Sequence, residues 1–306
     1  MHAALDARGR LTRETENPAI MTGDGHERLA IIAGGGSLPA VLARRVAETG
    51  RPFSVFAIRD EADAEALAPF QPIWLGWGEI GRLFKVMKEH GCRDIVLIGS
   101  VRRRPSLWSM LGDWGTVRRL PRILKAIVGG DDSVLKKVIG IFESEGFRIV
   151  GAHDVAPELL APEGCMTAKR PDETSERDIA TGSAMVHTLS PFDVGQAVVI
   201  ARGRVIAVEA AEGTDAMLQR CATLRNDGRI GPAGCGVLVK CVKAGQELRT
   251  DLPTIGPATV EAVAAAGLSG IAVEAGHVLI AEPDETIAIA ERAGIFLIGV
   301  PVGQGS

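Results

Sequence analysis

The stretch "RLAIIAGGGSLPAVLARRVAETG", residues 28–50, decides the fold class of this chain. Its apolar run up to Ala33 predicts a buried strand, and the triple glycine that follows predicts a tight turn. Apolar residues then recur at helical spacing until Gly50, and a second apolar strand, "FSVFAIRD", begins at Phe53. A strand, a glycine turn, a helix and a second strand in this order are typical of the start of a doubly wound α/β domain.

The same alternation continues along the chain and predicts a second α/β domain. The first half has further predicted helices at 80–90, 120–128 and 133–145 and strands at 94–100 and 147–155. The second half has predicted helices at 177–189, 257–266 and 284–293, a hairpin around Arg202 and Gly203, and apolar strands on either side of them.

These patterns place the domain boundaries. Residues 1–28 are polar and without period, which predicts a disordered extension. We expect a Rossmann-like first domain at 29–160, a linker at 161–176, where proline, glutamate, glycine and threonine are frequent, and a second, catalytic α/β domain at 177–306.

Composition excludes several classes of protein. Hydrophobic residues make up 46% of the 306 but aromatic residues only 4%, so the cores are built from small aliphatic side chains. A formal net charge of −4 predicts no nucleic-acid partner. Five widely spaced cysteines without a CxxC pair favour reduced thiols in a cytoplasmic protein, and the sequence has neither a membrane-spanning run nor a signal peptide.

The glycine turn is the first candidate binding site. Gly34, Gly35 and Gly36 lie between a predicted strand and a predicted helix, where bare backbone and free helix N–H groups favour phosphate. Ser37 is positioned to cap that helix. Pro39 replaces the third glycine of the dinucleotide-binding motif, which weakens a nicotinamide hypothesis and leaves a nucleotide site or a simple packing turn open.

Charged residues gather at two places in the second half. The stretch "EAAEGTDAML" places acidic residues and a threonine where a predicted strand ends and a predicted helix begins. These residues either form a loop that binds substrate or metal, or simply cap the helix and complement its dipole. The stretch "KCVKAGQELRTD" alternates cations with one carboxylate, which suits a diphosphate with a divalent metal or a solvated strand face. The predicted substrate-binding residues in and just after these two stretches are Glu212, Thr214, Asp215, Lys240, Lys243, Gln246 and Thr254.

Other reactive side chains indicate no further site. His153 and His187 are isolated and have no metal-ligand spacing, so both are interpreted as structural. No nucleophile elbow or Walker lysine motif is present.

Eight stretches taken together resemble one family, the LpxI-type UDP-2,3-diacylglucosamine pyrophosphatases of lipid A biosynthesis. They occur in the order expected for that family and cover almost the whole chain from residue 31 onward. They are "IAGGGSLP", "GEIGRLFK", "GDDSVLKKV", "EGFRIVGAHDV", "DVGQAVVI", "VEAAEGTDAML", the spaced lysines with "QELRTD", and "DLPTIGPATV".

The resemblance implies hydrolysis of a UDP-linked diacylated glucosamine lipid to UMP and 2,3-diacylglucosamine 1-phosphate (lipid X). It also implies two α/β domains, a homodimer and a divalent cation, Mg²⁺ or Mn²⁺. The family's essential aspartate corresponds to Asp251, as metal ligand or positioner of water, with Arg249 and the threonines in support. This chain departs from the family at Val242 and Ala244, where prolines are usual.

A two-chain lipid needs an apolar receptacle, and the stretch "SLWSMLGDWGTV" (106–117) is a candidate. The nearby arginines favour peripheral contact with an anionic inner membrane. Two alternatives stay open: a nicotinamide-dependent oxidoreductase that uses the glycine turn, and a nucleotide-binding module without catalysis.

Overall fold

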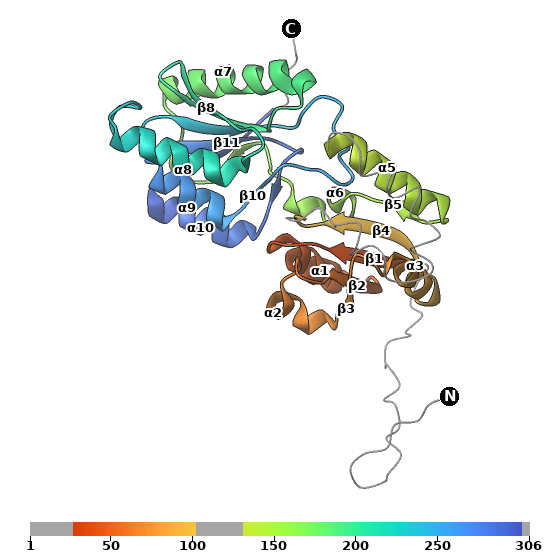
Figure 1. Ribbon diagram of the computed structural model, residues 1–306. Coiled ribbons are helices and arrows are strands. Elements are labelled where there is room, and N and C mark those ends of the chain that lie inside the picture. The colour runs from red at the N-terminus through yellow and green to blue at the C-terminus, as the bar shows by residue number, and fades with distance from the viewer. Residues whose placement is uncertain (1–26, 102–130, 302–306) are drawn as a thin grey trace.

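The computed structural model describes residues 27–101 and 131–301, without the side chains of 131–134. Two layered α/β units follow one another along the chain (Figure 1), which confirms the predicted fold class. The described residues leave out residues 1–26 of the predicted extension, the arginines near 102–122, the tryptophan-bearing stretch and the helix expected at 120–128. Arg28, the last residue of the predicted extension, is the first residue of the first strand.

The first unit is built on a five-stranded parallel sheet in the order β3-β2-β1-β4-β5. This is the order of the first five strands in doubly wound dinucleotide-binding sheets. The central strand β1 lies between two neighbours and has helices over both faces, so nearly all of its residues are buried and apolar. The strands are β1 (Arg28–Ala33), β2 (Phe53–Ile58), β3 (Ile73–Leu75), β4 (Cys92–Ile98) and β5 (Arg148–Ile149).

Two hydrophobic clusters fill the opposite faces of this sheet. One packs against α1 (Leu38–Glu48), and the other against α3 (Ile80–Glu89) and α5 (Asp131–Ser144). Short turns α2 (Ala64–Leu67), η1 (Ala68–Phe70), α6 (Ala152–Val155) and η3 (Pro157–Leu159) complete the unit.

The prediction of a strand over 147–155 is correct only for Arg148–Ile149 and is wrong for the residues that follow. Only Arg148–Ile149 pair with β4, and α6 begins directly after Gly151. The Asp154 carboxylate accepts the N–H of Gly151 at 2.9 Å, which closes a helical turn that a strand would not allow.

The second unit is a mixed six-stranded sheet in the order β6-β13-β11-β9-β7-β8. Its centre is parallel (β9, β11 and β13), while β6, β7 and β8 run antiparallel to their neighbours. The strands are β6 (Gly164–Cys165), β7 (Ala197–Ala201), β8 (Arg204–Val208), β9 (Val237–Lys240), β11 (Gly270–Glu274) and β13 (Phe296–Val300), with β10 (Thr254–Ile255) and β12 (Leu279–Ile280) forming a separate parallel pair.

Helices cover both faces of this sheet unequally (Figure 1). α7 (Glu173–Leu189) and the turn η4 (Ser190–Phe192) lie on one side, and α8 (Gly213–Asn226), α9 (Pro257–Ala265) and α10 (Pro283–Ala293) lie on the other. The expected hairpin is present: Arg202 and Gly203 both have positive φ, as a two-residue turn of this kind requires. The buried Asp178 of α7 accepts both of their N–H groups, at 2.8 and 2.6 Å.

The segment 161–176 is hydrogen-bonded to the second sheet. It contains β6, whose partner is β13, and Met166 donates to the carbonyl of Leu297 at 2.8 Å. At its end, Asp172 accepts from the N–H of Ser175 and caps α7, which therefore begins four residues before the predicted start. In the part of the chain that the structure describes, we find no helix long and apolar enough to span a membrane.

Two helical glycines are expected to respond in opposite directions to alanine. A Cβ on Gly182 of α7 would lie 2.6 Å from the Val239 side chain, so Gly182→Ala should destabilise the fold by roughly 1–3 kcal/mol. Gly140 of α5 is exposed and has nothing within 4 Å, so Gly140→Ala should stabilise by about 0.5–1 kcal/mol through helix propensity. Urea unfolding of both variants measures the difference. Equal effects of the two would contradict the packing of α7 on β9.

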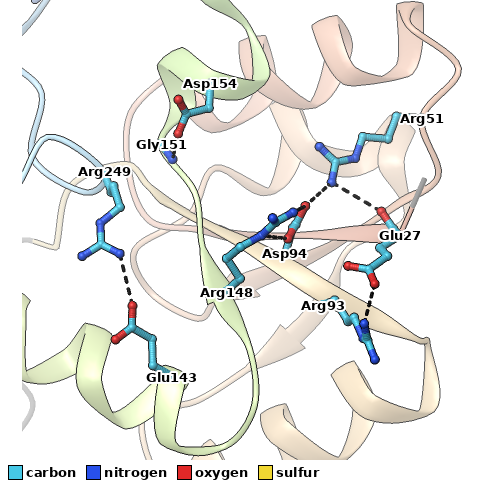
Figure 2. Close-up of polar contacts among 9 residues, drawn as sticks. All are labelled: Glu27, Arg51, Arg93, Asp94, Glu143, Arg148, Gly151, Asp154 and Arg249. Carbon is cyan, nitrogen blue, oxygen red and sulfur yellow. Dashed lines mark hydrogen bonds and ion pairs between the residues drawn. The ribbon is translucent and has the colours of Figure 1, made fainter. Parts of the chain in front are cut away.

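A buried acid in the first unit predicts a pH dependence of stability. Asp94 is 5% exposed and accepts from Arg148 at 2.7 and 2.8 Å and from Arg51 at 2.6 Å (Figure 2). Burial alone would raise the pKa of Asp94, but the hydrogen bonds and charges of the two arginines outweigh it and hold the pKa below its usual value.

A lowered pKa means that the stability contributed by Asp94 is complete above its unfolded pKa, about 3.9, and is lost as pH falls through the folded pKa. Asp94→Asn should therefore be less stable than the wild type at pH 7. The difference in unfolding free energy should shrink as pH drops below about 4. Denaturant titrations at pH 7 and pH 3 test this, and a difference that did not shrink would contradict it.

Candidate functional site

The glycine turn lies where the loops after β1 and β4 meet. Gly34 donates its N–H to the carbonyl of Ile98 at 2.8 Å, and Gly35 exchanges two backbone hydrogen bonds with Ser100 at 2.7 and 2.9 Å. A Cβ on Gly34 would lie 2.6 Å from the Ser100 carbonyl oxygen. The first two glycines are therefore needed for close contact between the two loops, and their N–H groups are already used.

The start of α1 has some, but not all, of the features predicted for a phosphate-binding helix start. Gly36 has φ +88° and nothing near its missing Cβ, so its conformation requires glycine. Ser37 occupies the N-cap position, but its side chain makes no capping hydrogen bond, and a proline lies in the first turn as expected. Phosphate binding by Gly34, Gly35, Gly36 and Ser37 stays a prediction that now rests on Gly36 and the helix start.

A buried polar network stands at the carboxyl end of β9. The Nζ of Lys240 donates to Thr214 Oγ1 at 3.0 Å, and that hydroxyl donates to Glu209 Oε1 at 2.7 Å. The other oxygen of Glu209 accepts from the N–H of Gln196 at 2.9 Å. Both Lys240 and Glu209 are 8% exposed, so the charges interact with little screening by water.

The electrostatics of Lys240 reflect this burial. Desolvation lowers the pKa of its ammonium group, while the nearby carboxylates of Glu209, Asp215 and Asp251 act in the opposite direction. Residues from three separate segments, 209–215, 240 and 251, therefore lie close enough to interact. Of the predicted binding residues, the structure brings together Thr214, Asp215 and Lys240 with Asp251.

The loop 241–253 presents Asp251. Gln246 holds it, because its Nε2 donates both to the Asp251 carbonyl and to Oδ2, the latter at 2.7 Å. The Oε1 of Gln246 accepts the N–H of Lys243 at 2.9 Å, which closes the loop on itself. The hydroxyl of Thr250, next to Asp251, is buried and makes no hydrogen bond with any described residue.

Arg249 is held by one carboxylate of its own loop and one of α5. Its guanidinium donates twice to Glu247, at 2.8 and 2.9 Å. It also donates to Glu143 of α5 at 3.1 Å (Figure 2). These hydrogen bonds to carboxylates raise the pKa of Arg249 above its usual value. A second contact, from Lys136 of α5 to the carbonyl of Gly245, also joins this loop to the first unit.

The remaining predicted residues are more peripheral. Glu212 accepts from Arg220 at 2.9 Å, Lys243 pairs with Asp193 at 2.7 Å, and Thr254 donates to the carbonyl of Leu252. Two carboxylates at this site were not among the predicted site residues. Glu247 lies within the "QELRTD" stretch itself, next to the residues that were predicted. Glu143 belongs to none of the quoted stretches, because it reaches the site only through the packing of α5 against the loop.

The fold and site together define a two-domain α/β protein with a buried lysine-acid network beside a carboxylate-bearing loop. Two family models match it: the LpxI N-terminal domain at residues 28–159 and the LpxI C-terminal domain at residues 162–298. The chain therefore belongs to the LpxI family.

A curated relative agrees with this assignment. The chain is 39% identical over 279 residues to the "UDP-2,3-diacylglucosamine pyrophosphatase LpxI" of Caulobacter vibrioides (strain ATCC 19089 / CIP 103742 / CB 15). The match covers 89% of this chain and 97% of the relative.

Proposed function

We propose that this protein hydrolyses the diphosphate of UDP-2,3-diacylglucosamine and releases UMP and 2,3-diacylglucosamine 1-phosphate. Family membership and the name of the Caulobacter relative support the reaction. The observation that carries the site is the approach of Asp251, on its loop, to the buried cation of Lys240 and its acidic neighbours. The oxidoreductase alternative has no comparable support, because the N–H groups of Gly34 and Gly35 bind the loop after β4.

The chain's own residues supply two functions in this proposal. Lys240 provides a positive charge in a site with little water, where it stabilises negative charge that develops on a phosphoryl group far better than an exposed lysine would. Asp251, oriented by Gln246, binds the metal or positions the attacking water. Glu209 and Thr214 hold the ammonium group of Lys240 in place.

The residues around Asp251 fit a hard divalent cation. Mg²⁺ prefers carboxylate and other oxygen ligands and keeps several waters. Asp251 offers a carboxylate, and the buried hydroxyl of Thr250 has no partner among the described residues. We therefore propose Mg²⁺, or Mn²⁺ in its place, with Asp251 as ligand. Such an ion neutralises the charge of the diphosphate as phosphorus is attacked.

Arg249 supports Asp251 indirectly in this proposal. Its three hydrogen bonds go to Glu247 and Glu143, so it fixes the loop relative to α5. We assign it as a positioning residue for Asp251. The homodimer, the cytoplasmic location and the contact with the inner membrane remain predictions, and the arginines on which membrane contact depends lie outside the described residues.

The test is hydrolysis of UDP-2,3-diacylglucosamine by the purified full chain in ¹⁸O-enriched water, with and without EDTA. Release of UMP that stops with EDTA and returns with Mg²⁺ is the expected result. Mass spectrometry of both products then shows which phosphorus receives the label. Binding of the substrate without turnover, whatever divalent metal is added, would instead indicate a nucleotide-binding module.

A further inference from the structure

A second polar cluster lies on the opposite side of β9 from Lys240. Successive residues at a strand end point to opposite faces of the sheet. Lys240 points toward α8, whereas Cys241 packs in the cluster under α7. There it meets His187 of α7 and Glu274 at the end of β11. One ligand atom from each of the three side chains lies within 4.8 Å of the other two.

Glu274 is the unusual member of this cluster. Its side chain is 1% exposed, and Oε2 accepts the N–H of Val242 at 2.8 Å. Its other oxygen, Oε1, is buried and has no hydrogen-bond partner among the described residues. His187 Nε2 lies 3.8 Å from Oε1, which is too far for a hydrogen bond. A buried carboxylate oxygen without a donor is costly, so this atom is expected to have a ligand.

An imidazole nitrogen, a thiolate and a carboxylate oxygen are together a ligand set for zinc. Bond lengths of about 2.0–2.3 Å put ligand atoms of a tetrahedral zinc roughly 3.3–3.7 Å apart. The separation of 3.8 Å between His187 and Glu274 is close to this range. The His187 side chain is 31% exposed, so one member of the cluster is in contact with solvent.

We propose that His187, Cys241 and Glu274 form a binding site for Zn²⁺ or a similar soft divalent cation. The bound ion would tie the first residue of the loop 241–253 to β11 and α7. Cys241 loses its thiol proton to solvent when the metal-sulfur bond forms. This site is separate from the proposed Mg²⁺ site and does not depend on the hydrolytic reaction.

Cobalt provides the test, because a thiolate ligand gives Co²⁺ a charge-transfer band that oxygen ligands do not. The full chain, stripped with a chelator and titrated with Co²⁺, should show this band at one equivalent. Excess Mg²⁺ should leave it unchanged, and Zn²⁺ should abolish it. No band in the wild type would overturn the proposal, whether or not the protein hydrolyses its substrate.

Variants assign the ligands. Cys241→Ser should lose the band, whereas Cys221→Ser, which alters a buried thiol in the cluster under α8, should keep it. His187→Ala changes a partly exposed side chain, and it should weaken Co²⁺ binding about tenfold or more. An unchanged titration in His187→Ala, or equal behaviour of the two cysteine variants, would contradict the site.

Discussion

Asp251→Asn should lower kcat by about 10³-fold or more and leave substrate binding nearly unchanged. Asparagine has the same shape and keeps an oxygen that can accept from Gln246, so the loop should hold its position. What is lost is the negative charge that binds the metal or orients water, a contact that matters most in the transition state. Single-turnover kinetics, with substrate affinity measured separately, distinguish the two effects.

The matched control is Asp227→Asn, which changes an exposed acid at the end of α8. It should keep wild-type kcat. Substantial turnover by Asp251→Asn, or an equal loss in both variants, would remove Asp251 from the proposed mechanism.

Lys240→Met should lower kcat/KM by about 100-fold, as expected when one stabilising cation is removed from a buried site. Methionine fills much of the volume of the lysine stem, so the effect reports the ammonium group and not a cavity. Lys85→Met on α3, where the side chain is 75% exposed, is the control and should be neutral. Circular dichroism checks that both variants are folded.

The wild-type pH profile gives a second measure of the same residue. Because burial lowers the pKa of Lys240, the lysine loses its proton at a lower pH than the usual value of about 10.4. The alkaline decline of kcat/KM should therefore begin below that value, since this profile reports the free enzyme. A decline that persisted unchanged in Lys240→Met would show that another group titrates.

The sequence was informative where periodicity alone determines structure. β1, α1, β7, the hairpin at Arg202 and Gly203, and the last helix and strand are at or near their predicted positions. Prediction failed at 147–155, where the bond between Asp154 and Gly151 competes with an apolar pattern that favours a strand. It also missed β3 and β6, whose two or three residues are too short to show a period.

For the site, sequence identified the reactive residues better than their partners. The glycine triplet was predicted to bind phosphate, but the N–H groups of Gly34 and Gly35 are hydrogen-bonded to the end of β4 and the loop after it. The glycine motif alone does not indicate this contact, because the partner residues are more than 60 positions further along the chain. Arg249 was predicted to support Asp251, but no sequence pattern indicated that Glu143, 106 residues away, accepts one of its hydrogen bonds. The proposed ligands His187, Cys241 and Glu274 are far apart in the sequence, so no ligand spacing indicates them.

The ion pair between Arg249 and Glu143 has a consequence for how firmly the loop 241–253 is held against α5. Both side chains are substantially exposed, at 38% and 49%, and a solvent-exposed pair of this kind contributes only about 0–1 kcal/mol. Thermal energy at room temperature, about 0.6 kcal/mol, is of the same size. The pair therefore adds little to the attachment of the loop to α5, and it adds less as salt concentration rises.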